Sequence, residues 1–97
     1  MPGEVTDNRA AERFEMRVDG QLALIAYRRG EGRIILVHTE VPEALSGQGV
    51  GSRLVRGALD LIRAEGLRVV PRCSFVAAYM ARHPETGDLL AEALPPG

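Results

Sequence analysis

Three alternate glycines, Gly47, Gly49 and Gly51, stand where a strand-like segment gives way to an amphipathic one. Glycine lacks a side chain and tolerates positive φ angles, so the N–H groups of such a loop stay open to a ligand. The free N–H groups at the start of a helix, together with its partial positive charge, bind anions. The spacing therefore predicts a main-chain cradle for a phosphate or pyrophosphate. We expect the cradle to consist of Gly47, Gln48, Gly49, Val50, Gly51 and Ser52, with Arg53 one turn into the helix.

Two titratable side chains precede the glycine loop on the strand-like segment. His38 and Glu40 are two positions apart, which on a strand places both on one face, about 6.6 Å from each other. A neutral imidazole or a carboxylate of raised pKa removes protons from substrates, so either residue could act as a general base. The alternative is structural, with His38 bound to a partner inside the sheet and Glu40 at a solvated strand end.

Cys73 is the single cysteine, so no internal disulfide is expected. With only two histidines in the chain, we also expect no metal site. Cys73 falls between a short strand and a helix, where the helix N-terminus can lower the pKa of a thiol and raise its reactivity. It could serve as a proton donor or as a nucleophile with His38 as its base. Alternatively it is a small buried apolar residue, as free cysteines often are.

Alternation of apolar and polar residues predicts three strands before the glycine loop, at 13–18, 21–28 and 33–41. The dipeptide Asp19-Gly20 is typical of a tight hairpin turn, and a second turn is expected over 29–32. Three strands joined by short turns form an antiparallel meander.

Apolar residues recur at helical spacing after the glycine loop, and Gly66 is the expected stop of this helix. A short strand follows at 67–72, and the right-handed crossover makes it parallel to the strand before the loop. A second helix is expected over 75–82, capped by Ser74, and a weak turn over 89–94. The predicted fold class is therefore α/β with a mixed sheet: an antiparallel meander, a parallel β-α-β unit and a C-terminal helix.

The chain has 97 residues, 45% of them hydrophobic, which suits one compact domain. We expect that domain to span 13–97, behind a flexible lead-in at 1–12. The formal net charge of −1 comes from 12 basic and 13 acidic residues without long runs, which argues against binding to nucleic acid or an anionic membrane. No apolar stretch reaches the length of a membrane span and the N-terminus lacks signal-peptide features, so we expect a cytoplasmic protein.

Pro71 interrupts the last predicted strand, because proline cannot donate a hydrogen bond to a neighbouring strand. If this strand diverges there from the strand that ends at Val41, a slot opens beside the glycine loop. An extended ligand could fill the slot and bind its phosphates to the loop. Coenzyme A, which is long, thin, amide-bearing and tipped by a pyrophosphate, has that shape. A dinucleotide-binding Rossmann site is excluded because the spacing of the glycines is not Gly-x-Gly-x-x-Gly. A P-loop is excluded because the chain has no lysine.

The order of these elements resembles the acetyl-CoA-binding half of the GNAT superfamily of N-acetyltransferases. The elements are the three strands, a helix opened by the loop Gly47-Gln48-Gly49-Val50-Gly51, and a further parallel strand and helix. Ser46 stands where the superfamily motif usually has glutamine or arginine. The resemblance extends to the minimal, single-domain YjdJ-type branch. The segments that carry it are His38-Thr39-Glu40-Val41-Pro42, Pro71-Arg72-Cys73-Ser74-Phe75-Val76, Tyr79 and His83-Pro84-Glu85.

The resemblance implies acetyl-CoA as ligand, with its pyrophosphate on the glycine loop and its thioester in the slot near Val41. An amine must lose a proton before it attacks the thioester, so His38 or Glu40 is the expected base, while a main-chain N–H near the strand end polarises the carbonyl. Cys73 could protonate the departing thiolate or take the acetyl group itself, and direct transfer is the expected path. Superfamily members often have a tyrosine for this proton on the last helix, which makes Tyr79 the competing donor.

The acceptor is an amine of unknown identity, small or macromolecular. Full-length members of the superfamily wall the acceptor site with two helices and two strands that have no counterpart among the predicted elements. We therefore expect this site to be open, completed by a second copy, or completed by a large acceptor. An exposed sheet edge, at 13–18 or beyond Pro71, could pair two copies into a homodimer. The alternatives to an enzyme are a non-enzymatic CoA-binding module and a protein-interaction domain that keeps the fold without the ligand.

Overall fold

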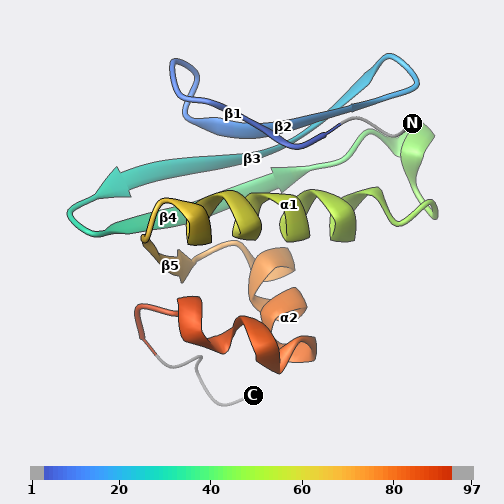
Figure 1. Cartoon of the computed structure of the whole chain (residues 1–97). Helices are drawn as coiled ribbons and strands as arrows, with labels where there is room; N and C mark the ends of the chain where they lie inside the picture. Colours follow the sequence, from blue (N-terminus) through green and yellow to red (C-terminus); the bar gives the residue numbers. More distant parts are fainter. Residues whose placement is uncertain (1–3, 93–97) are drawn as a thin grey trace.

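A computed structural model describes residues 4–92 and has one five-stranded sheet at its centre. The strands lie in sequence order from β1 to β5 (Figure 1). Each strand from β1 to β4 is antiparallel to the next, whereas β5 is parallel to β4. The predicted mixed α/β fold, with a meander followed by a parallel unit, is therefore confirmed. The strands are β1 (Thr6–Asn8), β2 (Arg13–Val18), β3 (Gln21–Gly30), β4 (Arg33–Glu40) and β5 (Arg68–Pro71).

The turns between the strands follow the chemistry of their residues. Asp19 and Gly20 have φ angles of 51° and 76°, as the hairpin turn expected for this dipeptide requires. The second turn is shorter than predicted, because β3 continues to Gly30 and pairs it with Arg33. The turn therefore consists of residues 31 and 32.

Two helices follow the meander, α1 (Val50–Ala64) and α2 (Ser74–Arg82). Helix α1 ends as predicted, with Gly66 at a φ of 72° and the N–H of Leu67 donating to the oxygen of Ile62 at 3.3 Å. The predicted cap of α2 is wrong. Ser74 is the first residue of the helix, and Cys73 is the N-cap in extended conformation, without a side-chain capping bond.

Within residues 4–92, two short 3₁₀ segments accompany the helices, η1 (Glu43–Leu45) before α1 and η2 (Pro84–Leu89) after α2. A weak turn was expected over 89–94, but the helical turn comes earlier, in η2. Leu90 then pairs with Val69 of β5 in an isolated parallel bridge. Residues 93 and 94 of the expected turn lie outside the described residues.

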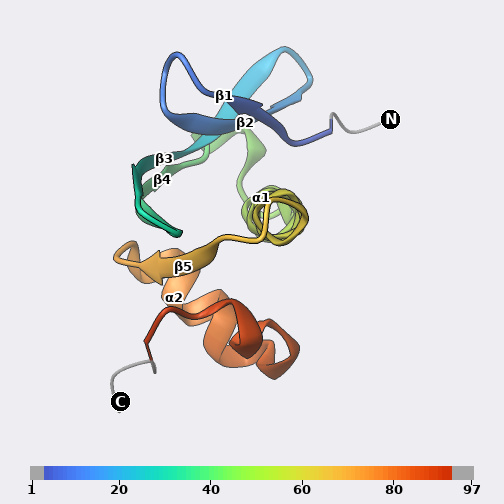
Figure 2. The same ribbon diagram turned by 60° about the vertical axis from the view of Figure 1, so that its left-hand side comes forward.

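One face of the sheet packs against both helices and forms the core. The N–H of Cys73 donates to the oxygen of Leu36, which ties the start of α2 to β4. Val76 and Met80 of α2 belong to the same buried cluster as the sheet, and Figure 2 shows α1 against one side of the strands. The side chains that point from the strands into this core are Phe14, Met16, Val18, Ala23, Ile25, Tyr27, Ile34, Leu36 and Val69.

The opposite face of the sheet, here called the open face, carries the alternate residues of each strand. Its apolar side chains in strand interiors are half-buried or, at Val37, exposed, whereas those of the core face are fully buried. Within residues 4–92, both helices lie on the core side. The open face consists of Arg13, Glu15, Arg17, Leu22, Leu24, Ala26, Arg28, Arg33, Ile35, Val37, His38, Glu40, Arg68 and Val70.

The N-terminal segment differs from the flexible lead-in expected over 1–12. Strand β1 pairs with the first half of β2, so this half is not the exposed edge that was expected. The Tyr27 hydroxyl donates to Asp7 at 2.6 Å, and the Tyr27 N–H donates to the oxygen of Glu12 at 2.9 Å. Burial raises the pKa of Tyr27, and the bond to Asp7 raises it further. Residues 1–3 of the expected lead-in lie outside the described residues.

Gly57, in the middle of α1, leaves the space in which the N-terminal segment packs. A Cβ at this position would lie 2.4 Å from Cγ2 and 2.7 Å from Cβ of Val5. We expect Gly57→Ala to destabilise the protein, although alanine normally stabilises a helix by about 1 kcal/mol relative to glycine. In a Val5→Gly background the same change should stabilise. Urea unfolding of the four proteins measures this reversal, and an equal effect of Gly57→Ala in both backgrounds would contradict the contact.

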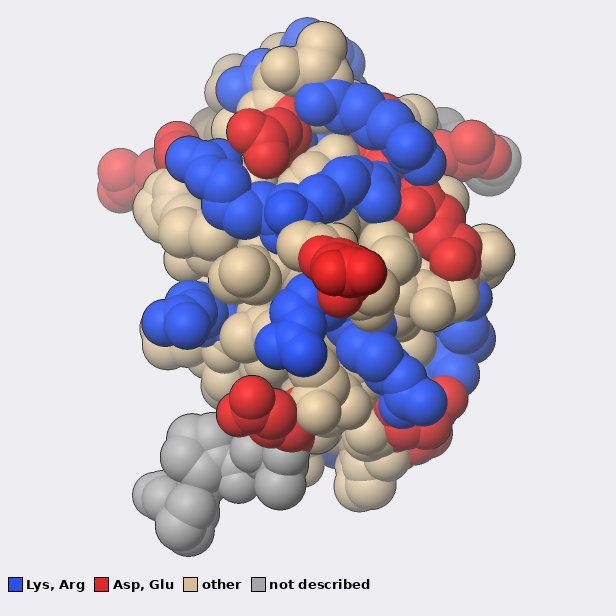
Figure 3. All heavy atoms as spheres, turned by 90° about the vertical axis from the view of Figure 1, so that its left-hand side faces the viewer, with Lys and Arg blue, Asp and Glu red and all other residues tan. Residues whose placement is uncertain are grey.

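Ion pairs join β1, β3 and the end of α1 across one end of the molecule. Arg29 donates to Glu65 at 2.9 Å and to Asp7 at 3.0 Å, and Arg9 donates to Glu65 at 2.7 Å. Figure 3 looks onto the end with the β3–β4 turn, where basic and acidic side chains lie interspersed. The hydrogen bond from Arg29 is the main reason that the pKa of Glu65 lies below its usual range.

This lowered pKa predicts how stability depends on pH. A carboxylate whose pKa is lower in the folded than in the unfolded protein stabilises the fold above the unfolded pKa, and its contribution disappears as the pH falls through the folded value. We expect the stability difference between wild type and Glu65→Gln to be largest at neutral pH and to shrink below the ordinary glutamate pKa of 4.5. Urea midpoints at a series of pH values measure it. Glu31→Gln, in the β3–β4 turn, is the control, and parallel curves for Glu65→Gln and wild type would refute the prediction.

Candidate functional site

The glycine loop forms an open cradle at the start of α1. Gly47 and Gly49 have φ angles of 79° and 71°, and a Cβ at either position would have no heavy atom within 4 Å. Gly49 is the N-cap of α1. A cavity of about 320 Å³ lies against this loop. It is lined by Val41, Leu45, Ser46, Gly47, Gly49, Val50, Gly51, Ser52 and Phe75.

Main-chain donors at the start of α1 are available to a ligand. The oxygen of Gly49 accepts from the N–H of Arg53 at 3.1 Å, which begins the helical hydrogen bonding. Within the described residues, the N–H groups of residues 49–52 have no acceptor in the protein. Unpaired donors in an open cavity at a helix start suit the oxygens of a phosphate or pyrophosphate. Gln48 and Arg53 are exposed and do not line the cavity.

Gly51 serves a different purpose from the other two glycines. A Cβ at this position would lie 2.6 Å from Cζ of Phe75, so the missing side chain lets α2 approach α1. Phe75 is 40% exposed and completes the wall of the cavity. The sequence interpretation did not select Phe75 as a site residue. The feature of the sequence that could have identified Phe75 is an aromatic residue at the start of a helix that packs beside the glycine loop.

The sheet opens beside this cavity at Pro71. Strand β5 ends opposite Leu36, whereas β4 continues to Glu40. The N–H of Cys73 donates to the oxygen of Leu36 at 2.9 Å, and beyond this point β5 has no residue paired with β4. Val37 is an extra residue in β4, a bulge, because its neighbours pair with the adjacent residues Ala26 and Tyr27 of β3. The pairing of β5 with β4 thus ends at Pro71, as expected, and a slot for a ligand at this point stays a prediction.

The candidate catalytic residues form two separate pairs on opposite faces of β4. The imidazole Nε2 of His38 lies 3.0 Å from a carboxylate oxygen of Glu40, and both side chains are more than half exposed on the open face. Cys73 is 8% exposed, and its sulfur lies 3.2 Å from the Thr39 hydroxyl. Thr39 pairs with Ile25, a core residue, so its side chain points to the face opposite His38.

The placement of these side chains on two faces of β4 decides which of the expected catalytic residues can act together. It joins His38 to Glu40 as one hydrogen-bonded unit, and it separates His38 from Cys73, for which it was a candidate base. Thr39 was not selected from the sequence. The signal that could have found it was its position between His38 and Glu40, because alternate strand residues face opposite sides. Cys73 lies at the opening of the sheet, where both its backbone and its side chain contact β4.

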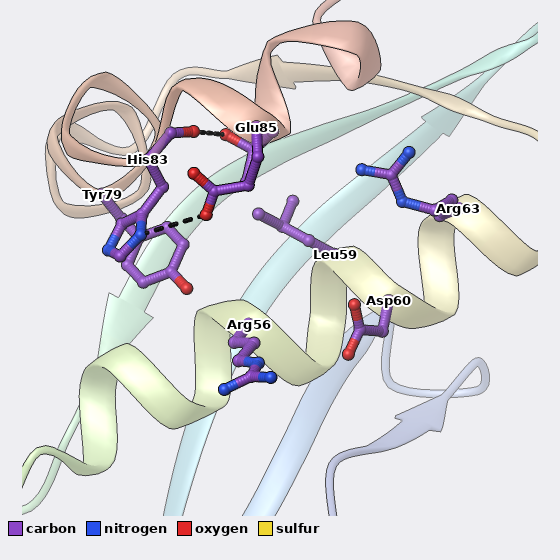
Figure 4. A pocket seen from close by; sticks show the side chains of 8 residues that line it. Arg56, Leu59, Asp60, Arg63, Tyr79, His83 and Glu85 are labelled. Atoms are coloured by element: carbon purple, nitrogen blue, oxygen red, sulfur yellow. Dashed lines mark hydrogen bonds and ion pairs between the residues drawn. The ribbon is translucent and has the colours of Figure 1, made fainter.

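Tyr79 lies in a second cavity, between α1 and the segment from α2 to η2. Figure 4 shows it with Arg56, Asp60 and Arg63 of α1 across from it. The Tyr79 ring stacks on His83 with 4.1 Å between ring centroids, and Nδ1 of His83 lies 3.3 Å from Glu85. This cavity measures about 400 Å³. Tyr79 does not line the glycine-loop cavity, and neither do His38, Glu40 and Cys73.

Two further observations concern metal ions and membranes. Among residues 4–92, no three histidine, cysteine or acidic side chains come close enough to hold a metal ion. The helices in the same part of the chain are too short or too polar to cross a bilayer.

Comparison with known proteins adds evidence from sequence and from structure. The sequence profile described as GCN5-related N-acetyl-transferase matches residues 13–89. Protein NATD1 of Gallus gallus is 33% identical over 86 residues, which cover 86% of this chain and 78% of the relative. Human NATD1 is also 33% identical, with 86% of this chain and 76% of the relative covered.

The solution structure of a GCN5-like protein from Staphylococcus aureus superposes on this fold with a TM-score of 0.71. The two chains are 27% identical, and the match covers 93% of this chain and 89% of the other. Residues 13–89, which the family profile matches, include the strands from β2 to β5, the glycine loop and both helices. The chain belongs to the GCN5-related N-acetyltransferase family.

Proposed function

We propose that this chain is an acetyl-CoA-dependent N-acetyltransferase that transfers the acetyl group directly to an amine. The observation that carries the proposal is the set of unpaired N–H groups at the start of α1, next to the opening between β4 and β5. Phosphate oxygens on these donors would leave the rest of an extended ligand at the opening, near Val41. Bound acetyl-CoA supplies an acetyl group that is activated as a thioester. The chain's own residues then position the acceptor and handle its protons.

The His38–Glu40 pair is the proposed base. Both groups lie on β4 next to the opening, they are exposed, and they are hydrogen-bonded to each other. An arriving ammonium group can pass its proton to the imidazole, whose positive charge the carboxylate then stabilises, or to the carboxylate, which becomes neutral while its hydrogen bond to the imidazole holds it in place. The amine is then free to attack the carbonyl.

Cys73 is the proposed donor of the proton that the departing thiolate needs. Its sulfur lies at the opening and is hydrogen-bonded to Thr39, whereas Tyr79 faces the second cavity. The separation of Cys73 from His38 favours direct transfer over an acetyl-cysteine, because Cys73 then lacks a general base. Incubation with acetyl-CoA alone, followed by intact-mass measurement, tests this step. An added acetyl mass that Cys73→Ala abolishes would reverse the assignment.

The proposal as a whole is tested by isothermal titration with acetyl-CoA and with CoA, followed by mass spectrometry of a panel of amines incubated with enzyme and acetyl-CoA. We expect micromolar binding and acetylation of at least one amine above the rate without enzyme. Binding without transfer to any amine would favour the non-enzymatic CoA-binding module. A folded protein that binds neither ligand would leave the interaction domain as the explanation.

A further inference from the structure

The open face of the sheet is the surface that an acceptor must cross to reach the His38–Glu40 pair. Across it, His38 lies beside Ala26, and Glu40 beside Leu24. The apolar side chains around the pair are half-buried or exposed, and Val37 at the bulge is 44% exposed. A solvated apolar strip next to a candidate catalytic pair is typical of a surface that binds a partner. The strip consists of Leu22, Leu24, Ala26, Ile35, Val37 and Val70.

The charge of this face is the reverse of the charge of the whole chain. It carries five arginines and two glutamates, whereas the chain has a net charge of −1. Glu15 is not available to a ligand, because Arg13 and Asn8 hydrogen-bond to it and the bond from Arg13 keeps its pKa below the usual range. Glu40 is bonded to His38. The arginines of the open face are Arg13, Arg17, Arg28, Arg33 and Arg68.

Two of these arginines are in direct cross-strand register. Arg33 of β4 pairs with Arg68 of β5, and both side chains are exposed. Like charges opposite each other on neighbouring strands destabilise a sheet. Within residues 4–92, Arg17 and Arg33 form no ion pair with an acidic side chain. Arg68 also donates one hydrogen bond to the backbone oxygen of Asp88. An anionic group bound to its other N–H groups and to Arg33 would offset the repulsion between the two arginines.

The distance between this arginine pair and the catalytic pair fits an extended peptide. Because of the bulge at Val37, the segment from Arg33 to His38 spans only the four positions from Gly30 to Ala26 on β3, which corresponds to about 13 Å of strand. A peptide that lies extended across the face rises by the same amount per residue, and its residues four positions apart point to the same side. A lysine at His38–Glu40 therefore places a residue four positions away beside Arg33 and Arg68.

We propose that the acceptor is a lysine within an acidic polypeptide segment, which lies extended on the open face with carboxylates four positions from that lysine. The inference rests on the proposed acetyltransferase function and adds the class of its acceptor. The apolar strip contacts the peptide between its charged residues, and the arginines on both sides of the strip select its carboxylates. Electrostatic selection of this kind acts mainly on the rate of association and weakens with salt.

A single-stranded nucleic acid is the competing anionic partner, and the face lacks what such a partner uses. Proteins that bind single strands stack the bases on aromatic side chains. The open face carries no phenylalanine, tyrosine or tryptophan. The side chains at the centre of the open face are aliphatic, and the His38–Glu40 pair is suited to removing a proton from an amine.

The test uses three synthetic peptides that differ only in the residues four positions on either side of one central lysine: glutamate, glutamine or arginine. With the full chain and acetyl-CoA, we expect kcat/KM to be at least tenfold higher for the glutamate peptide than for the glutamine peptide. The arginine peptide should be the poorest. The preference for glutamate should fall to within about twofold in the variant Arg33→Glu/Arg68→Glu, and also at 0.5 M salt, where screening is strong.

Arg82→Glu, an exposed arginine at the end of α2, is the matched control and should keep the full preference. If the enzyme acetylates the three peptides equally, the inference is wrong, although the proposed acetyltransferase function stands. If no acetyl-CoA binds and no amine reacts, the proposed function itself fails. Tighter binding of single-stranded RNA than of the glutamate peptide to the open face, lost in Arg33→Glu/Arg68→Glu, would replace the polypeptide by a nucleic acid.

Discussion

Gly49→Asp is expected to weaken the binding of acetyl-CoA by about 100-fold or more while the protein stays folded. The new carboxylate would stand at the N-cap of α1, among the N–H groups of residues 49–52 that have no acceptor in the protein. The negative charge of this carboxylate repels the pyrophosphate, and its oxygens accept the hydrogen bonds that the pyrophosphate needs. Isothermal titration of both proteins with acetyl-CoA measures the change.

The control separates charge in the cradle from strain in the backbone. Gly49 has a φ of 71°, so any other residue is strained there. Gly20 has a φ of 76° and equally open surroundings, but it lies in the β2–β3 turn. Gly20→Asp should therefore lower the melting temperature by a similar amount and leave binding unchanged. Wild-type affinity in Gly49→Asp would exclude this loop as the pyrophosphate site.

Replacing the base should lower kcat by about 100-fold, the usual size of a general-base contribution. We expect this from Glu40→Gln or His38→Gln, whichever removes the group that receives the proton, with the KM for acetyl-CoA within about twofold of wild type. The rate of that variant should also keep rising at high pH, because the amine must then lose its proton to water. Initial rates over a range of pH, with one amine acceptor, measure both effects.

The hydrogen bond between the two side chains predicts how their effects combine. Because His38 and Glu40 form one unit, the double variant should be little slower than the slower single variant. Glu31→Gln, in the β3–β4 turn, is the control for a lost exposed carboxylate. Wild-type rates and pH profiles in both single variants would remove the pair from the mechanism.

Local sequence patterns were sufficient for most of the fold. The apolar periodicity and Gly66 predicted α1 and its end, and the alternation in β2, β3 and β4 predicted the meander. Pro71 predicted where the sheet opens, because a proline that cannot donate a hydrogen bond ends the strand pairing by itself. Each of these features depends on residues that are close together in the chain.

The features that the sequence did not predict depend on distant partners. Strand β1 has only three residues, and the bond from Tyr27 to Asp7 holds it across 20 positions. The contact between Thr39 and Cys73 spans 34 positions. The site of Tyr79 depends on how α2 is rotated against α1, which no local periodicity specifies. The two pairs on opposite faces of β4 could have been separated by strand alternation alone.

The close contact between Gly51 and Phe75 links two parts of the chain that evolution can change only together. A side chain at residue 51 has no room while the Phe75 ring occupies that space. We expect relatives with alanine or serine at the position of Gly51 to carry a residue smaller than phenylalanine at the position of Phe75. Covariation of this kind would indicate that the entrance to the cavity by the glycine loop is adjusted by exchanging volume between the two helices, with the backbone of the loop kept unchanged.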